Sequence, residues 1–207
     1  MDPAPAQHWN RVYVTKSDDL LSWHQAFPEV SLQLLRHAGM EKDAGIVDVG
    51  AGGSRLVDGL VDQGFSRLTL LDTSEAALAR TKERLGRDAK GIRFQVGDVR
   101  AFRPPETYDA WHDRAVFHFL VGAEEREVYV ASLKRAVRAG GHVVMGTFAE
   151  DGPQRCSGLP VMRYSPQALA AALGPEFRAV ESTRDLHVTP GGNIQPFTFV
   201  RFVRAGG

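Results

Sequence analysis

Short apolar runs alternate along the chain with longer segments in which apolar residues recur every three or four positions. Residues 45–50 and 68–72 are rich in valine, isoleucine and leucine, the composition of strands that are buried on both faces. Between them, residues 54–63 place their apolar side chains on one face of a helix. The pattern therefore predicts buried strands joined by amphipathic helices.

The same patterns of apolar residues predict helices and strands in the rest of the chain. Further helices are predicted at 28–39, 74–85, 124–138 and 165–174, and further strands at 92–96, 108–112, 142–148, 177–188 and 195–204. We expect residues 139–141 to form a turn, residues 149–164 a long loop, and the last two strands an antiparallel hairpin. Residues 9–25 have no clear period and are interpreted as an ordered N-terminal arm. Strands that alternate with helices predict an α/β fold with a doubly wound, mostly parallel sheet.

Composition narrows the class of protein. The 207 residues, 43% of them hydrophobic, suit one compact domain. Twenty-five basic residues balance twenty-five acidic ones, so we expect neither a nucleic-acid nor a membrane partner. The single cysteine, Cys156, excludes an internal disulfide framework and a multi-cysteine metal site, and no metal is expected. Without a leader-like segment or a long apolar run, the protein is expected to be cytoplasmic; its oligomeric state stays open.

Polar residues follow several predicted strands at the points where they end. Residues 48–54 form a glycine-rich turn, Asp72 and Asp98 follow the next two strands, and residues 112–118 follow the fourth. The carboxyl ends of parallel strands meet at one edge of the sheet, where such folds bind ligands. A dinucleotide-binding motif would need a third glycine where this chain has Arg55, which disfavours a nicotinamide dehydrogenase.

The turn Asp48-Val49-Gly50-Ala51-Gly52 resembles the acid-x-Gly-x-Gly motif of class I S-adenosylmethionine (SAM)-dependent methyltransferases. The resemblance covers residues 28–204, with Ser54 where the family often has a third glycine. It implies a Rossmann-like sheet of seven strands in the order 3-2-1-4-5-7-6 with an antiparallel last strand. It also implies SAM as cofactor, S-adenosylhomocysteine (SAH) as product, a methyltransferase domain at 28–207, and an arm or lid at 1–27.

Residue roles in cofactor binding follow from this resemblance. Asp72 is expected to accept hydrogen bonds from the ribose hydroxyls, and Asp98 to bind the adenine amino group while Val99 donates its backbone N–H to the ring. Asp48 is expected to hold the ammonium group of the methionine part. The alternative is that Asp72 and Asp98 only cap helices or loops. The expected cofactor-binding residues are Asp48, Gly50, Ala51, Gly52, Asp72, Thr73, Asp98, Val99 and Arg114.

Candidate catalytic residues lie in segment 111–119, which resembles the Asp-Arg segment of thiopurine-type thiol methyltransferases and, more loosely, the Asp-Lys segment of small protein-lysine methyltransferases. His112 and His118 are candidate bases, Asp113 a candidate orienting group, and Arg114 an anion clamp or a cofactor-side ion pair. The alternative is that Asp113 and Arg114 form a structural pair and that the histidines are packed in the core. The chain lacks the Asn/Asp-Pro-Pro-aromatic motif, which disfavours methylation of DNA bases or glutamine.

The expected acceptor pocket draws on loops that should overhang the same sheet edge. The candidate substrate-binding residues are Tyr13, Trp23, His24, Cys156, His187 and Gln195. We expect methyl transfer to a small-molecule nucleophile, for instance a thiol. A protein-lysine methyltransferase is the alternative within the family, and a non-catalytic SAM-binding module is the alternative from another class.

Overall fold

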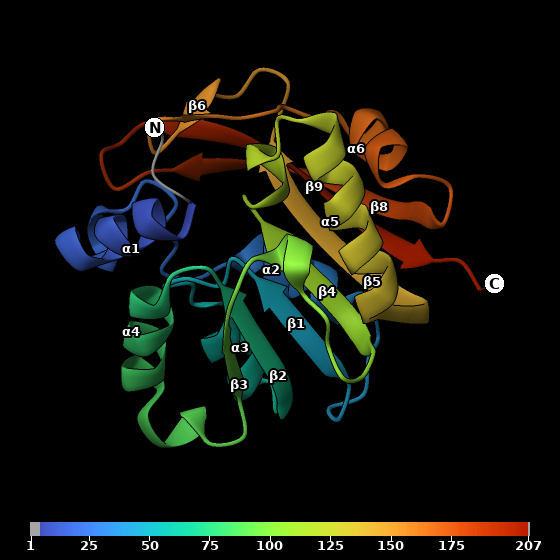
Figure 1. Ribbon diagram of the computed structural model, residues 1–207, viewed down its shortest axis with the longest axis horizontal. Coiled ribbons are helices and arrows are strands. Elements are labelled where there is room, and N and C mark those ends of the chain that lie inside the picture. The colour runs from blue at the N-terminus through green and yellow to red at the C-terminus, as the bar shows by residue number, and fades with distance from the viewer. Residues whose placement is uncertain (1–4, 207) are drawn as a thin grey trace.

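A seven-stranded sheet runs through the middle of the protein in the computed structural model, which describes residues 5–206 (Figure 1). Its strands are β1 (Gly45–Val49), β2 (Arg67–Asp72), β3 (Arg93–Val96), β4 (Tyr108–Arg114), β5 (Val137–Phe148), β8 (Phe177–Val188) and β9 (Ile194–Arg204). They lie in the order β3-β2-β1-β4-β5-β9-β8, and β9 alone runs opposite to the other strands of this sheet. Counted within the sheet this is 3-2-1-4-5-7-6, so the predicted fold class and strand order are confirmed.

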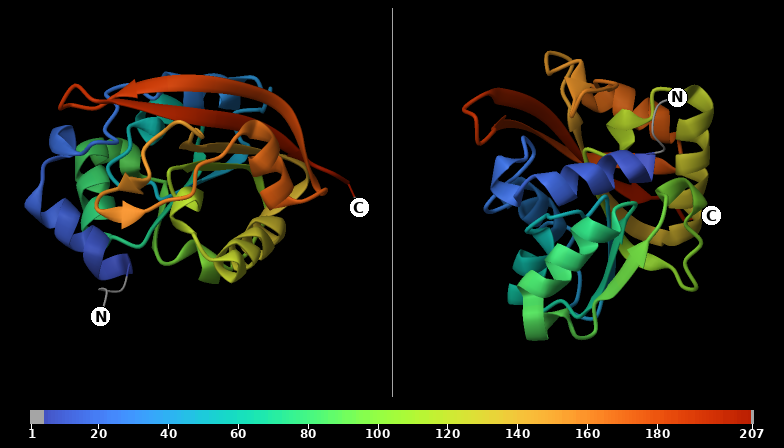
Figure 2. Two further views of the ribbon diagram at one scale, coloured as in Figure 1. Left: turned by 90° about the horizontal axis from the view of Figure 1, so that it is seen from above. Right: turned by 60° about the vertical axis from the view of Figure 1, so that its left-hand side comes forward.

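Helices cover both faces of the sheet (Figure 2). The helices are α2 (Glu29–Arg36), α3 (Leu56–Asp62), α4 (Glu75–Leu85), α5 (Ala123–Ala136) and α6 (Pro166–Leu173). Because side chains alternate along a strand, Ile46 packs with α2 and α3 on one face, while Val47 and Val49 pack with α5 and α6 on the other. The apolar run at β1 is therefore buried from both sides, as its composition predicts.

Helix ends follow the expected capping chemistry. The Ser74 hydroxyl accepts a hydrogen bond from the Ala77 N–H at the start of α4, and Ser165 caps α6 with Pro166 in its first turn. Gly174 ends α6 with a φ of 85°, in the left-handed region that favours glycine. None of the described helices is both long and apolar enough to cross a membrane.

Three segments around the second half of the sheet differ from the sequence-based expectation. Residues 139–141 do not form a turn but belong to β5, whose register against β4 is irregular because Tyr108 pairs with Val137 and Ala110 with His142. The expected loop at 149–164 contains a small hairpin, β6 (Arg155–Cys156) and β7 (Leu159–Pro160). Strand β4 also runs on to Arg114, since it stays paired with β5 as far as Gly146.

The N-terminal arm is mostly helical rather than irregular. Helix α1 (Pro5–Thr15) is followed by the short 3-10 helix η1 (Asp18–Leu20), and α1 lies beside α4. Trp9 and Tyr13 are four residues apart, so both turn toward the body of the protein while Val14 stays exposed. The mixture of aromatic and charged residues concealed this one-sided pattern in the sequence.

A buried hydrogen-bond chain joins β4 to α5. The Tyr129 hydroxyl donates to Asp113 Oδ2 over 2.5 Å and accepts from the Trp111 indole N–H over 3.0 Å. Asp113 Oδ1 accepts the Val116 N–H, which fixes the chain just beyond β4. All three side chains are fully buried, and the Trp111 indole N–H has only the Tyr129 hydroxyl as its partner among the described residues.

Removal of the Tyr129 hydroxyl should therefore destabilise the fold. We expect Tyr129→Phe to lower the free energy of unfolding by about 1–3 kcal/mol, because Asp113 and Trp111 each lose a partner in the core. Tyr164→Phe is the matched control, since the Tyr164 hydroxyl is buried without a partner among the described residues. Urea unfolding of both variants measures the difference, and equal losses would contradict the role given to the chain.

Candidate functional site

A cavity of about 260 Å³ lies at the carboxyl ends of the parallel strands, beneath α1 and the β6–β7 hairpin. Its walls come from β2, β3, β4, the arm and the hairpin. The lining residues are Trp9, Tyr13, Trp23, Gly50, Leu71, Asp72, Thr73, Gly97, Asp98, Val99, Arg100, Arg114, Ala115, Val116, Phe119, Leu120, Glu125, Cys156, Leu159 and Pro160. A smaller cavity of about 50 Å³ adjoins it and shares Tyr13, Trp23, Gly50 and Arg114. The predicted strand-end site is thus a cavity with two connected parts.

Asp72 forms the floor of the larger cavity at the end of β2. Its Oδ2 accepts the Gly52 N–H over 2.8 Å, and its Oδ1 accepts the Ser74 N–H over 2.7 Å. Burial raises the pKa of Asp72 to about 6 despite these hydrogen bonds, and the nearby Asp48 adds to the effect. Each oxygen keeps a lone pair with which it can accept a hydrogen bond from a ligand hydroxyl.

Asp98, which follows β3, lies at one end of the same cavity. Its carboxylate is paired with the guanidinium of Arg100. Its carboxylate accepts the Arg100 N–H over 2.8 Å and binds the Arg100 guanidinium with contacts as short as 2.6 Å. Burial opposes ionisation, but the hydrogen bonds and charge of Arg100 lower the pKa of Asp98 below its ordinary value. Arg100 also binds Glu125 over 2.7 Å, so this wall is a fixed chain of three charged side chains.

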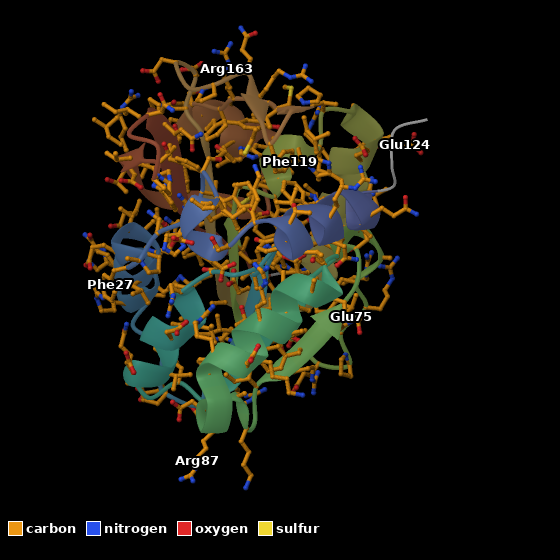
Figure 3. The ribbon with its side chains drawn as sticks, turned by 90° about the vertical axis from the view of Figure 1, so that its left-hand side faces the viewer. Phe27, Glu75, Arg87, Phe119, Glu124 and Arg163 are labelled. Atoms are coloured by element: carbon orange, nitrogen blue, oxygen red, sulfur yellow. The ribbon has the colours of Figure 1, made fainter. Side chains whose placement is uncertain are left out.

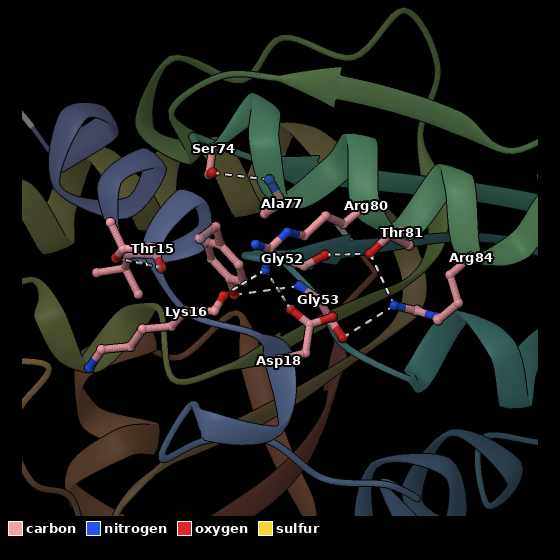
Figure 4. Close-up of polar contacts among 12 residues, drawn as sticks. Thr15, Lys16, Asp18, Gly52, Gly53, Ser74, Ala77, Arg80, Thr81 and Arg84 are labelled. Carbon is pink, nitrogen blue, oxygen red and sulfur yellow. Dashed lines mark hydrogen bonds and ion pairs between the residues drawn. The ribbon is translucent and has the colours of Figure 1, made fainter.

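The glycine-rich turn is held from α4. The Gly52 carbonyl accepts the Thr81 hydroxyl over 2.7 Å, and the Ser54 carbonyl accepts a guanidinium N–H of Arg84 over 2.7 Å. Figure 4 shows Thr81 and Arg84 reaching from α4 to this turn. Gly50 has a φ of 63°, and a Cβ there would stand 2.1 Å from Val116, so only glycine fits. The turn is therefore fixed before any ligand binds.

The arm closes over the cavity through contacts with that turn and with α4. The Tyr13 hydroxyl accepts both the Gly53 N–H and the Trp23 indole N–H, and Arg80 of α4 binds Asp18 and the Lys16 carbonyl (Figure 4). Trp9 packs edge-on against Phe119 with ring centroids 5.2 Å apart. Figure 3 shows Phe119 next to α1. The arm thus forms a wall of the site, and its aromatic side chains face the cavity.

Three buried polar side chains form a chain behind the smaller cavity. His112 on β4 contacts Asp48 Oδ1 through Nδ1 over 2.7 Å and the Ser31 hydroxyl through Nε2 over 2.8 Å. All three are at most 4% exposed and line this cavity. Asp48 Oδ2 is buried and has no partner among the described residues. His112 is therefore placed to orient Asp48.

Asp113, the candidate orienting group, and His118, a candidate base, line neither cavity. Asp113 is fully buried and is bonded to Tyr129, Val116 and Phe117, and burial raises its pKa to about 6. His118 is fully buried among aromatic rings, and burial with the charge of Arg114 lowers its pKa to about 3. His118 is therefore packed in the core, whereas Asp113 is buried with Tyr129 as its side-chain partner and does not form the alternative pair with Arg114.

Arg114 lies where the two cavities meet, and it is not paired with Asp113. Its Nη1 donates to the Trp23 carbonyl over 2.9 Å, and its guanidinium carbon lies 4.6 Å from the centre of the Phe197 ring. Its Nε and Nη2 are buried without a partner among the described residues. Burial lowers the pKa of Arg114 to about 10, so the side chain remains a cation at neutral pH.

The candidate substrate residues divide into two groups. Tyr13, Trp23 and Cys156 line the larger cavity, and His24 lines the smaller one. His187 and Gln195 face each other on the β8–β9 hairpin and line neither cavity; His187 Nε2 instead contacts the Ser22 carbonyl over 2.7 Å. Burial raises the pKa of Cys156 to about 11 against the opposing charge of Arg114, so its thiol is protonated at neutral pH.

Comparison with known proteins agrees with this geometry. Residues 47–145 match the methyltransferase domain family. The chain is 33% identical over 89 residues to nodulation protein S of Rhizobium tropici, covering 43% of this chain and 37% of that protein. It is 33% identical over 116 residues to EEF1A lysine methyltransferase 2 of Danio rerio, covering 51% and 48%. The match spans less than half the length of these curated relatives.

A solved structure shows the same fold. The N-methyltransferase NodS from Bradyrhizobium japonicum WM9, in complex with SAH, superposes with a TM-score of 0.69 at 15% identity and covers 96% of this chain and 100% of that one. The chain carries a class I SAM-dependent methyltransferase domain. The resemblance seen at the glycine-rich turn is thereby confirmed.

Several residues of the methyltransferase site could not be found from the sequence. Ser31 of α2 and the Arg100–Glu125 pair belong to no motif, and they reach the site only through packing of distant segments. Of the expected cofactor-binding residues, Thr73 and Val99 line the larger cavity and Asp48 and Ala51 the smaller one, whereas Gly52 directs its N–H to Asp72 and lines neither. Within residues 5–206, no three His, Cys, Asp or Glu side chains are grouped to hold a metal ion.

Proposed function

We propose that this protein transfers the methyl group of SAM to a small-molecule nucleophile. The observation that carries the proposal is the covered cavity, in which Asp72, Asp98 and the glycine-rich turn lie under an arm of aromatic side chains.

The side chains present fit the chemical groups of SAM. Asp72 offers two carboxylate oxygens for the ribose hydroxyls, while Asp98 and the Val99 N–H lie where the adenine would be held. Asp48 Oδ2, a buried acceptor without a partner among the described residues, suits the ammonium group of the methionine part. SAM would supply an electrophilic methyl group, so the protein's task is chiefly to position the acceptor.

The size of the cavity favours a small acceptor. Its 260 Å³ is below the roughly 300–1,000 Å³ typical of sites for drug-sized ligands, and the cofactor would occupy most of it. A lysine side chain on a protein is the second candidate, because the matched relatives include an EEF1A lysine methyltransferase. The aromatic side chains of the arm disfavour the lysine candidate. Trp9, Tyr13 and Trp23 cover the cavity into which a protein substrate would have to insert its lysine.

Acceptor screening tests the proposal directly. Purified protein incubated with methyl-labelled SAM and with separated small-metabolite and protein fractions should label the small-metabolite fraction. Label confined to the protein fraction would favour the lysine candidate. Binding of SAH without transfer to either fraction would favour a non-catalytic SAM-binding module.

Asp72 should make cofactor binding depend on pH. Because burial raises its pKa to about 6, the carboxylate that accepts the ribose hydroxyls is lost as the pH falls through about 6, and SAH affinity should fall with it. The stability of the unliganded protein responds in the opposite sense. Because folding raises the pKa of Asp72, protonation of this carboxylate favours the folded state. The stabilisation is fully present below pH 3.8, the ordinary pKa, and is lost as the pH rises through about 6.

Calorimetric titration with SAH on both sides of about pH 6 measures this effect. Asp72→Asn should bind SAH about ten- to a hundredfold more weakly at neutral pH and should lose most of the pH dependence. An unchanged affinity in this variant would refute the ribose role of Asp72.

His112 should act on cofactor binding through Asp48, as a positioning residue. His112→Phe removes the partner of Asp48 Oδ1, so SAH should bind about tenfold more weakly. The analogue 5′-methylthioadenosine, which lacks the amino-acid group, should bind with little change. Ser31→Ala is the milder control, because Ser31 contacts only the far nitrogen of His112. Equal losses for both ligands would indicate a general structural role instead.

A further inference from the structure

The β8–β9 hairpin extends beyond the rest of the sheet and contacts the arm (Figure 1). Strand β5 pairs with β9 only as far as Phe197, whereas β8 and β9 stay paired as far as Val188 and Ile194. In this extension His187 of β8 is buried, and its Nε2 lies 2.7 Å from the Ser22 carbonyl oxygen. Because a carbonyl oxygen only accepts hydrogen bonds, His187 Nε2 carries a proton and donates it. The hairpin thus binds the backbone of the arm.

A buried cation binds the next carbonyl of the arm. Arg114 at the end of β4 donates from Nη1 to the Trp23 carbonyl over 2.9 Å. Among the described residues, its Nε and Nη2 have no hydrogen-bond partner, and neither does the buried Oδ2 of Asp185 on β8. Asp185 is the cross-strand partner of Phe197, and the Arg114 guanidinium is stacked on the ring of Phe197. The two opposite charges therefore lie beside the same ring, and the charge of Asp185 stabilises the buried guanidinium.

The segment of the arm that is bound in this way contributes walls to both cavities. Trp23 lines both of them, and His24 lines the smaller one. The Trp23 indole N–H donates to the Tyr13 hydroxyl over 3.3 Å, and the same hydroxyl accepts the Gly53 N–H of the glycine-rich turn. Contacts that fix the backbone at Ser22 and Trp23 therefore also fix the side chains that face the cofactor site.

We propose, on the basis of the proposed function, that Asp185 and His187 are positioning residues for cofactor binding, although neither lines the two cavities. Asp185 acts through Arg114 on the Trp23 carbonyl, and His187 acts directly on the Ser22 carbonyl. Together they keep the arm against the cofactor site, so SAM and SAH stay bound longer than they would beside an arm without these contacts.

The first test measures the rate at which SAH dissociates from the immobilised protein by surface plasmon resonance. Asp185→Asn and His187→Phe should each raise this rate about three- to tenfold, the effect expected when one hydrogen bond is lost or weakened. The association rate should change less. Asp185→Glu, which keeps the charge, should retain most of the slow dissociation. Arg184→Met is the matched control on the same strand and should leave the rate unchanged, because Arg184 pairs with Asp151 at the surface.

Combined variants separate the two routes from the hairpin to the arm. In Arg114→Met the Trp23 carbonyl has already lost its donor, so the addition of Asp185→Asn should change the SAH dissociation rate little further. His187→Phe should still raise the rate in the Arg114→Met background, because His187 acts on the Ser22 carbonyl. Effects of Asp185→Asn and Arg114→Met that simply multiply would overturn the route from Asp185 through Arg114.

Hydrogen exchange of the protein without ligand distinguishes positioning of the arm from general stability. In Asp185→Asn and His187→Phe, the backbone amides of residues 16–25 should exchange faster, while those of β1 and β4 keep their protection. Loss of protection throughout the sheet would indicate a merely structural role and overturn the inference. So would SAH dissociation rates that neither hairpin variant changes, or that Arg184→Met changes equally. Failure of the unmodified protein to bind SAH at all would instead refute the proposed function.

Discussion

The hydrogen bond from the Gly52 N–H to the Asp72 carboxylate is the contact on which the rest of the site depends. It joins the turn after β1 to the end of β2, and the Ser74 N–H on the second oxygen fixes the start of α4 to the same carboxylate. Helix α4 also binds the glycine-rich turn through a hydrogen bond from Thr81, and it binds the arm through a hydrogen bond from Arg80. One buried acid thus links the sheet, the turn and the arm.

The glycines of the turn serve the protein's own packing as well as a ligand. A Cβ on Gly52 would stand 2.2 Å from the Tyr13 hydroxyl, and one on Gly53 would stand 2.8 Å from Asp18. The arm can therefore lie against the turn only because these side chains are missing. The motif that identified the fold in the sequence is thus also the surface on which the N-terminal arm rests.

Patterns local in sequence predicted the fold well, and contacts between distant segments account for what was missed. Strand composition, the Ser74 and Ser165 caps and the acids at strand ends are local signals, and the structure has them as expected. The burial of Asp113 is different, because it depends on Tyr129 sixteen positions later on α5. Sequence spacing placed Asp113 correctly at the end of a strand, but only packing decides that its carboxylate turns into the core.

The charges of the site are divided between its two parts. Asp48 and Asp72 repel each other at the ends of β1 and β2, and each would be stabilised by a cationic ligand. Arg114 at the end of β4 is a cation, and the negative charge of Asp185 on β8 acts on it. A cofactor that carries a sulfonium and an ammonium group, as SAM does, would satisfy the demand of the two acids, so the charge pattern at the ends of β1 and β2 favours the proposed cofactor.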